Sequence, residues 1–419
     1  MLGGASNATG SGSYSLSGDS SMLSVDGSVY VGYSGTGLFT QSGGTHTVLD
    51  TLTLAANPGS SGTYNLQGGS LQAANVLINS GGVINQTGGS LTATAGLTNQ
   101  GTYTMAGGTL SGATLTNNAT FSGYGTITTT TGAGFNNYGT MTLTGGASLV
   151  SGDFTNQSSG FLYITTNPAT FTGNVVNNGY LKVQGAFPGD ESIFIRLGTF
   201  TNNGTYSTDP ATQVFDNLIV GTGGSFEGGA GDKFVISGDF INHSTRNLAW
   251  NTVQSDLVFT NVPAGSLNHL LSLPGADLGQ TRAGYTNNFA WGSLELKKNQ
   301  TLTLADGNLT PGGAFYVGSI LGVTLEGGKV TDIFGNGLDI YYNSDLAANA
   351  YLDGLTYELM GGGYLAPVAD GFQALNRDLL TGRAMAVQTP LPASVWLFLS
   401  GLLGLGLLRG RKFRGPKQN

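Results

Sequence analysis

The sequence predicts an all-β fold: a parallel β-helix (β-solenoid) with coils of about 19–25 residues, a small β-rich capping module and a single C-terminal transmembrane helix. Three observations predict the solenoid. A glycine-bordered octapeptide recurs along the first half, and an asparagine marker recurs out of phase with it. The chain also has 71 glycines in 419 residues and only 9% charged residues, with Thr, Ser and Asn filling the deficit as strand-and-turn formers.

Six octapeptides share one pattern, and their starts are 25, 25, 20, 19 and 38 residues apart. They are GSYSLSGD from Gly12, GLFTQSGG from Gly37, GTYNLQGG from Gly62, GVINQTGG from Gly82, GTYTMAGG from Gly101 and GTMTLTGG from Gly139. A degenerate unit, ATFSGYGT from Ala119, divides the longest interval. Since residues two apart on a strand share a face, the third and fifth positions are expected to form one inward stripe. Leu71, Leu91 and Leu110 form a further column, which also contains His46.

The second marker is an asparagine that recurs every 18 to 25 residues in N-x-G or N-N-x-G contexts. Asn and Gly tolerate left-handed backbone angles, so we expect one turn per coil at this marker. Stacked amide side chains hydrogen-bond along cross-β assemblies, and we expect the same here. The predicted structural column contains Asn57, Asn79, Asn99, Asn117, Asn136, Asn156, Asn177 and Asn202.

A period near 20 residues also occurs in leucine-rich repeats, but leucine is too sparse here for their spacing. An antiparallel sandwich would give turn signals every 8–12 residues without a fixed phase. We therefore expect a right-handed parallel β-helix, with the hand inferred from crossover preference. The expected domains are the repeats over residues 1–300, a β-rich module over 301–370 that covers the open strand edges, a linker over 371–388 and a tail over 389–419.

The β-rich module is expected to contain a turn at FGNGL, between two strands, and a short helix in SDLAANAYL. Ser344 or Asp345 is the expected cap of that helix.

The tail combines a proline-containing motif, an apolar run and a basic end. Residues 393–408 contain no charge, and as a helix they would be about 24 Å long, slightly less than a hydrocarbon core of about 30 Å. Trp396 is expected at a membrane interface, and a basic flank is expected on the cytoplasmic side. That flank is formed by Arg409, Arg411, Lys412 and Arg414, within a basic end that spans 409–417.

Pro390-Leu391-Pro392-Ala393, followed by this apolar run and basic end, resembles the PEP-CTERM sorting signal of exported proteins in Gram-negative, exopolysaccharide-producing bacteria. Leu391 stands where the family often has Glu. The resemblance covers about 30 residues of tail, and the upstream segment KVTDIFGNGLDIYYNSDLAANAYLDGLTYEL resembles a module common before such tails. The glycine-rich coils resemble those of autotransporter-type β-helix proteins. The family implies that an exosortase, a membrane Cys protease-transpeptidase, recognises the motif as its substrate and removes the tail.

The family also implies an N-terminal export signal. None is visible before the repeats, and we expect that this chain begins downstream of its true start.

The chain has no cysteine, which excludes disulfides, thiolate metal sites and Cys nucleophiles. No Lys or Arg precedes Lys182. The chain has 15 Lys and Arg residues, five of them in the tail, so the rest of the chain has 10 basic residues against 23 acidic ones. Such a surface repels phosphate backbones, so no nucleic-acid partner is expected.

No metal site, cofactor or catalytic constellation is expected. The histidines His46, His243 and His269 have no shared spacing. The GGAGD segment at Gly228–Asp232 lacks the following Lys-Ser/Thr of a phosphate loop. Tyr33 and Tyr124 are expected to be exposed, and their rings could stack on sugars. The scattered acids are expected to be solvated loop residues or turn formers: Asp190, Glu191, Asp232, Asp239, Asp339 and Asp345.

The sequence therefore predicts a non-catalytic structural or adhesive protein. It would be exported, pass through the inner membrane and reach the cell surface or extracellular matrix, where exopolysaccharide is the expected partner. Three alternatives stay open: a secreted polysaccharide lyase or hydrolase on the same solenoid, a permanently membrane-anchored surface protein, and an autotransporter passenger. The first needs clustered carboxylates or basic residues that face the sugar, and the last needs an outer-membrane barrel.

Overall fold

The structure is a computed structural model of one chain. It describes residues 1–4, 10–130, 132, 134–165, 168–185, 192–261, 267–308 and 312–368. The described residues belong to one compact unit, Met1–Ala369. The predicted linker (371–388), sorting motif, apolar helix and basic end all lie outside the described residues.

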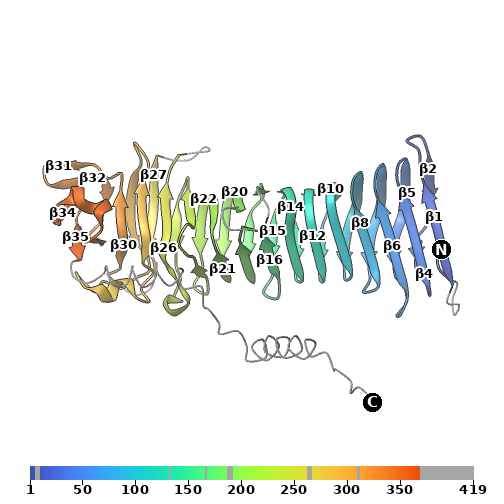
Figure 1. The fold of residues 1–419 in the computed structure, drawn as a ribbon, viewed down its shortest axis with the longest axis horizontal. Helices are drawn as coiled ribbons and strands as arrows, with labels where there is room; N and C mark the ends of the chain where they lie inside the picture. The colour runs from blue at the N-terminus through green and yellow to red at the C-terminus, as the bar shows by residue number, and fades with distance from the viewer. Residues whose placement is uncertain are drawn as a thin grey trace, which may run out of the picture. The chain divides into compact units, whose positions relative to one another are not determined.

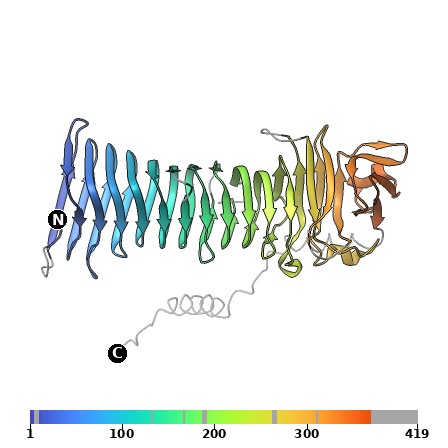
Figure 2. The same ribbon diagram turned by 180° about the vertical axis from the view of Figure 1, so that it is seen from behind.

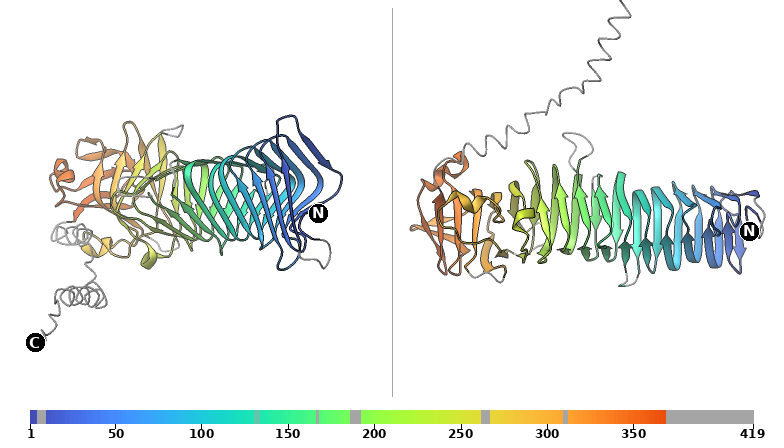
Figure 3. Two further views of the ribbon diagram at one scale, coloured as in Figure 1. Left: turned by 45° about the vertical axis from the view of Figure 1, so that its right-hand side comes forward. Right: turned by 90° about the horizontal axis from the view of Figure 1, so that it is seen from below.

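The chain folds into an all-β parallel solenoid of about 15 turns. Successive coils stack on one another from β1 to β35, as Figures 1 and 2 show from opposite sides. The strand pairings define three walls that run along this stack (Figure 3). Stacking is required because a single coil cannot bury its own apolar face. The long strands bend from one wall to the next, and their register shifts at the bend, for example between Ala106 and Thr109 of β10.

The first wall contains one strand, or the first part of a longer strand, from each of the first eleven coils. Its strands are β1 (Ser11–Leu16), β4 (Thr36–Gln41), β6 (Ser61–Leu66), β8 (Gly82–Gln86), β10 (Thr102–Gly112), β12 (Thr120–Thr129), β14 (Thr140–Ser151), β16 (Phe161–Ile164), β19 (Tyr180–Val183), β21 (Thr205–Thr208) and β23 (Ser225–Glu227).

The second wall runs along nearly the whole stack and takes in the second parts of β10, β12 and β14. Its other strands are β2 (Met22–Val25), β5 (Thr45–Leu54), β7 (Ser70–Ile78), β9 (Ser90–Asn99), β17 (Ala169–Phe171), β20 (Ser192–Asn202), β22 (Ala211–Val220), β24 (Lys233–Ile236), β26 (Thr252–Phe259), β28 (Trp291–Leu296), β30 (Ala314–Leu321), β33 (Asp339–Asn343) and β35 (Tyr364–Val368).

The third wall takes in the second parts of β5, β7, β9, β20 and β22. Its other strands are β3 (Val29–Val31), β11 (Leu115–Asn117), β13 (Phe135–Asn137), β15 (Phe154–Asn156), β18 (Val175–Asn177), β25 (Phe240–Asn242), β27 (Asn268–Leu273), β29 (Thr301–Asp306), β32 (Lys329–Phe334) and β34 (Tyr357–Met360). Three short 3-10 helices, η1 (Asn247–Ala249), η2 (Arg282–Tyr285) and η3 (Ala347–Leu352), and the two-residue strand β31 (Leu325–Glu326) complete the elements.

The inward columns of the first and second walls follow the predicted repeat. The third octapeptide position aligns in register from Tyr14 to Met141, and Phe121 supplies the position of the degenerate unit. Successive residues of this column are 25 apart from Tyr14 to Phe39 and 18 apart from Tyr103 to Phe121. The second-wall column from His46 through Leu71, Leu91 and Leu110 is likewise confirmed. Apart from Tyr14 in the first coil, which is exposed, the residues of both columns are buried.

The fifth-position column of the first wall contains two buried glutamines among apolar residues, since Leu16, Gln41, Leu66, Gln86 and Met105 are in register. Gln41 donates from Nε2 to the carbonyl oxygens of Gly44 and Ser70, which belong to two successive coils. Its Oε1 accepts a hydrogen bond from the hydroxyl of the buried Tyr64, with an oxygen–oxygen distance of 2.6 Å. Gln86 and Tyr103 repeat this arrangement two coils later. Each glutamine therefore links two successive coils inside the core by donating to one carbonyl oxygen in each, although the carbonyl oxygen of Gly44 also accepts from the N–H of Ser70.

Parallel pairing continues across residue 300, where the sequence predicts the start of a separate module. Strand β29 pairs in parallel with β27 on one side and with β32 on the other. Among the described residues, the named strands pair antiparallel in only two places, β31 with β32 and β34 with β35. The predicted FGNGL turn does separate two strands, β32 and β33.

The predicted helical segment forms η3, a 3-10 helix from Ala347 to Leu352. Leu346 precedes it, and no side chain caps it, so the expectation that Ser344 or Asp345 caps a helix is wrong. The backbone N–H of Asp345 instead donates to Oδ1 of Asn343.

Candidate functional site

A ladder of buried asparagines runs through six successive coils of the third wall. Each Asn side chain donates from Nδ2 to Oδ1 of the next Asn, with nitrogen–oxygen distances of 2.7–2.8 Å. Each Nδ2 also donates to a backbone carbonyl of the first wall in the next coil, such as Phe161 for Asn137. The ladder therefore joins neighbouring coils inside the core, where unpaired amides would be costly. Its members are Asn99, Asn117, Asn137, Asn156, Asn177 and Asn202.

Five of the eight asparagines named from the sequence lie in this ladder: Asn99, Asn117, Asn156, Asn177 and Asn202. The other three lie outside it. In the double asparagine of β13, Phe135 points inward, so the residue two positions on, Asn137, is buried and Asn136 faces out. Oδ1 of Asn136 accepts a hydrogen bond from Gln157 on the outside.

Asn57 and Asn79 do not occupy the ladder position; they lie three residues and one residue after it in their coils. Leu54 and Ile78 occupy the column in their coils, in register with Asn99 of the next coil. Asn79 donates to the carbonyl oxygen of Ala55 at the equivalent corner of the preceding coil. Asn57 is exposed and donates from Nδ2 to the hydroxyl oxygen of Ser34.

The glycine after the ladder turn is required by close packing, and not by a left-handed backbone as the sequence suggested. None of the eight named asparagines has a positive φ, and neither does Gly179 in the turn after Asn177. A Cβ on Gly179 would overlap the carbonyl oxygen of Gly160 in the preceding coil. Gly139 and Gly204 meet equivalent carbonyl oxygens. The N-x-G pattern thus marks an inward amide followed by a corner where two backbones touch.

The outward face of the first wall is a regular surface that the repeats create over eleven coils. Outward and inward residues alternate along its strands. One outer column contains Ser13, Leu38, Thr63, Val83, Thr102, Thr120, Thr140, Phe161, Tyr180, Thr205 and Ser225. The other contains Ser15, Thr40, Asn65, Asn85, Thr104, Ser122, Thr142, Tyr163, Lys182, Ser207 and Glu227.

These outer columns are almost entirely neutral, and most of their residues carry hydroxyl or amide groups. No residue from Thr51 to Gly152 is Asp, Glu, Lys, Arg or His. The amides bond to one another along the stack, since Nδ2 of Asn85 donates to Oδ1 of Asn65 at 2.9 Å. The wall can therefore exchange many hydrogen bonds with a neutral, hydroxyl-rich surface, but it offers no fixed charge over these coils.

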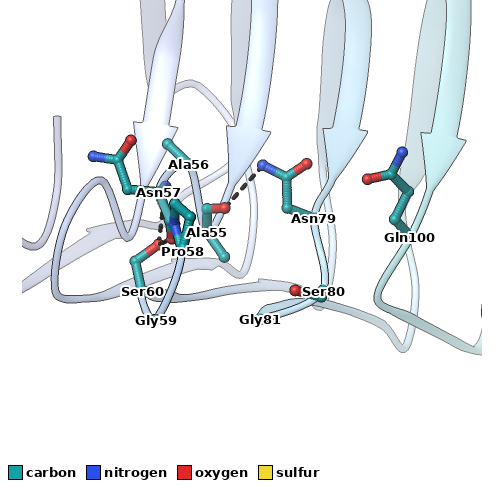
Figure 4. A pocket seen from close by; sticks show the side chains of 10 residues that line it. All are labelled: Ala55, Ala56, Asn57, Pro58, Gly59, Ser60, Asn79, Ser80, Gly81 and Gln100. Carbon is teal, nitrogen blue, oxygen red and sulfur yellow. Dashed lines mark hydrogen bonds between the residues drawn. The ribbon is translucent and has the colours of Figure 1, made fainter.

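A shallow hollow of about 320 Å³ lies at the corner between the third and first walls in three successive coils. Asn57, Asn79 and Gln100 lie at equivalent corners, and their amides lie in a row along the hollow (Figure 4). Ala55 lines the hollow with φ at 57°, in the left-handed region that disfavours alanine. The lining has no ionisable group, so the hollow can donate and accept hydrogen bonds but cannot transfer protons as a catalytic acid or base.

The three histidines have separate partners. Nδ1 of His46 contacts the hydroxyl of Tyr64 at 2.9 Å inside the core, and burial lowers the pKa of His46 to about 4. Because the Tyr64 hydroxyl already donates to Gln41, Nδ1 of His46 is the donor here. His243 contacts the carbonyl oxygen of Gly307, and His269 contacts Gly238 and Gln300. Within the described part of the chain, no three His, Cys, Asp or Glu side chains are grouped to hold a metal ion.

Asp232 is buried, contrary to the expectation of a solvated loop residue. Its Oδ1 accepts hydrogen bonds from the hydroxyl of Thr208 and the N–H of Ala211, both at 2.8 Å. Its Oδ2 accepts from the N–H of Gly229 at 2.6 Å. Burial is the largest cause of its raised pKa, and these three donors oppose the shift. The carboxylate thus fixes two neighbouring coils together.

The other acids named from the sequence have separate structural partners. Oδ1 of Asp239 accepts from the N–H of Leu270, and Oδ1 of Asp339 accepts from the N–H of Tyr364. Asp345 lies next to η3 and its side chain is half-buried. Asp190 and Glu191 lie outside the described residues.

The two tyrosines named as exposed rings are both half-buried. Tyr33 packs edge-on against Tyr30, with ring centroids 5.2 Å apart. Tyr124 lies against Gly146 of the next coil, where a Cβ would meet its ring. The outward rings of Phe161, Tyr163 and Tyr180 were not predicted from the sequence. The alternation FLYI and YLKV, with Leu162 and Leu181 inward, is the signal that could have identified them.

The predicted sorting residues Pro390, Leu391, Pro392 and Ala393 and the predicted membrane-flanking residues Trp396, Arg409, Arg411, Lys412 and Arg414 lie outside the described residues. In the part of the chain that the structure describes, no helix is long and apolar enough to cross a membrane. Compared with known proteins, the chain matches no family model, no curated protein and no solved structure.

Proposed function

We propose that this protein is a non-catalytic structural or adhesive component of the cell surface or extracellular matrix, associated with exopolysaccharide. The outer columns of the first wall carry this proposal. They present hydroxyl and amide groups in register over many coils, without charge from Thr51 to Gly152. Such a surface suits many weak, additive hydrogen bonds to a polymer, and it requires no reaction chemistry.

We also propose the delivery route that the tail suggests. The residues around Pro390 are the substrate of an exosortase, and residues 393–408 form a transient transmembrane helix with Arg409 on the cytoplasmic side. Proline keeps the preceding backbone extended, as a protease cleft requires. After cleavage the solenoid is released to the outside.

The segment after residue 301 serves in this proposal as the cap of the stack. Two features support that role. The hairpin of β34 and β35 pairs the third wall with the second wall, and β31 folds back on β32. Both turns place antiparallel strands where an open parallel edge would otherwise invite pairing with another chain.

The experiment that tests the proposal is the intact mass of the protein from its native host, measured separately in membrane and extracellular fractions. A released form that ends near Pro390 supports sorting and a matrix role. A membrane-bound form that retains Arg409 to Asn419 overturns the sorting proposal and favours a permanent anchor. Incubation of the released form with neutral and acidic polysaccharides checks catalysis, because new reducing ends or unsaturated uronates would contradict a non-catalytic role.

A further inference from the structure

An aromatic cluster interrupts the neutral outer columns of the first wall at one place. Phe161 and Tyr180 replace hydroxyl residues in one column, and Tyr163 and Lys182 replace them in the other. These four residues form a two-by-two block on strands β16 and β19, which are adjacent in the wall. We call this block the aromatic platform. The other outer positions of the two columns have no aromatic side chain.

The three rings contact one another; Phe161 is exposed, and Tyr163 and Tyr180 are half-buried. The ring planes of Phe161 and Tyr163 are within 8° of parallel, with centroids 6.4 Å apart. Tyr180 lies 6.1 Å from Phe161 and 6.2 Å from Tyr163, with its ring tilted relative to both. Phe161 is 45% exposed, and it differs from other exposed apolar residues of the strands, such as Leu38, in being grouped with two further rings.

Lys182 completes the block and forms no ion pair with the residues that the structure describes. It is in register with Tyr163 and half-buried. It is also the first basic residue of the chain. In its own column the nearest acidic residue is Glu227, two strands away, or about 10 Å at ordinary strand spacing. Asp209 lies nearer, since its N–H donates to the carbonyl oxygen of Val183, but among the described residues neither carboxylate forms an ion pair with Lys182.

Hydroxyl groups border the platform on both sides. Thr140 and Thr142 precede it in register, and Thr205 and Ser207 follow it. The combination is specific: apolar ring faces, one cation and flanking hydroxyls on an open wall. Sugar rings present C–H bonds on one face, which pack against the negative face of an aromatic ring, and hydroxyls around their edge. The cation adds a preference for a sugar that carries a carboxylate.

We propose that the aromatic platform binds a polysaccharide that contains uronic acid residues. One sugar ring packs on Phe161 and Tyr163, and a carboxylate of the polymer pairs with Lys182. The flanking threonines and Ser207 hydrogen-bond to neighbouring sugar hydroxyls. An open wall leaves room for the polymer to continue beyond the platform in both directions. This inference rests on the proposed function only in that the protein meets polysaccharide outside the cell.

The test measures binding of the purified full chain to immobilised polygalacturonate and to neutral dextran. Tyr163→Ser is expected to weaken binding to polygalacturonate by about tenfold or more, since such anchors commonly contribute at least that factor. Lys182→Gln is expected to weaken it about threefold and to reduce its salt dependence. Tyr364→Ser and Lys298→Gln are matched controls, because both residues are exposed on other parts of the solenoid, and they are expected to bind like the wild type.

Far-ultraviolet circular dichroism checks that each variant folds, which is expected because Tyr163 and Lys182 face outward. Three results would overturn the inference: no binding of the wild type to polygalacturonate, equal loss in platform and control variants, or binding to dextran that is as tight and does not need Lys182. The proposed function is judged separately. If the Tyr163→Ser protein still reaches the extracellular fraction of the host, the matrix role stands without the platform. A wild type that keeps its tail in the membrane contradicts the sorting route whatever it binds.

Discussion

Replacing Asn137 by alanine tests the asparagine ladder directly. Asn137 accepts a hydrogen bond from Nδ2 of Asn117 at 2.7 Å, and it donates to Oδ1 of Asn156 at 2.8 Å and to the carbonyl oxygen of Phe161 at 3.1 Å. Truncation removes all three bonds inside the core and leaves two acceptors short of a donor. Since each buried polar group that loses its partner costs about 1–3 kcal/mol, we expect local destabilisation of about 2–5 kcal/mol.

The neighbouring residue provides a matched control. Asn136 is half-buried, and its side chain accepts a hydrogen bond from Gln157 at 2.9 Å on the outside of the wall. Asn136→Ala should therefore cost about 0.5–1 kcal/mol. A third variant, Asn137→Leu, keeps the number and branching of the side-chain heavy atoms while removing the amide, and Leu54 shows that the column accepts an apolar residue at another coil. It separates lost packing from lost hydrogen bonds.

Hydrogen exchange of the full chain, read by mass spectrometry on peptides that cover β13 and β15, is the appropriate assay. Solenoids open locally, so a global unfolding midpoint would dilute the effect. For Asn137→Ala we expect exchange in these strands to accelerate by about thirtyfold or more, since 1.4 kcal/mol corresponds to a factor of about ten. If the Asn137→Ala and Asn136→Ala proteins exchange at the same rate in β13 and β15, the ladder contributes no more than a surface bond and the reasoning fails.

Three further predictions concern single buried features. Folded His46 has a pKa of about 4, whereas the unfolded side chain titrates near the ordinary histidine pKa of 6.5. The free energy of unfolding is therefore unaffected by His46 titration above pH 6.5, and it falls by up to about 3 kcal/mol as the pH is lowered toward 4. Thermal unfolding at pH 7.5 and 4.5 should show less pH dependence for His46→Leu than for the wild type. Asp232→Ala leaves three donors without their acceptor and should lower the free energy of unfolding by about 3–5 kcal/mol, and Asp232→Asn should lower it less. Urea unfolding followed by tryptophan fluorescence measures this. Equal midpoints for the wild type and Asp232→Ala would contradict a stabilising role of the buried carboxylate. Gly179→Ala should cost about 1–3 kcal/mol by the same measurement, whereas Gly27→Ala, which meets open space, should leave the midpoint unchanged.

The repeat phase was predictable from the sequence because alternation and glycine spacing are local signals. His46 was assigned to the correct column on spacing alone, and the degenerate unit around Phe121 occupies the coil expected for it. The predicted asparagine column was wrong at Asn136, where two neighbouring asparagines both fit the marker. Among Phe135, Asn136 and Asn137, the inward phenylalanine decides which amide is buried, and matching the marker by its N-x-G context did not use that information.

The candidate surface was less predictable. Whether Phe161 is core or exposed depends on which residues of β16 point inward, and the neighbours that make it a cluster come from a coil about 20 residues later. The burial of Asp232 was missed for a similar reason. Its three donors come from Thr208, Ala211 and Gly229, and no local spacing links them. Contacts of this kind join residues of different coils, so a local sequence pattern does not reveal them.

The ladder also bears on how the length of such a protein can change. Every ladder asparagine occupies the same register position, so the coils between Asn117 and Asn156 are interchangeable at that point. A deletion that starts and ends at equivalent positions, such as after Asn117 and after Asn137, would bring Asn117 against Asn156 with the same donor and acceptor facing each other. In-frame recombination between repeats can therefore lengthen or shorten the wall by whole coils, while each new junction keeps the hydrogen bond that holds its neighbours together.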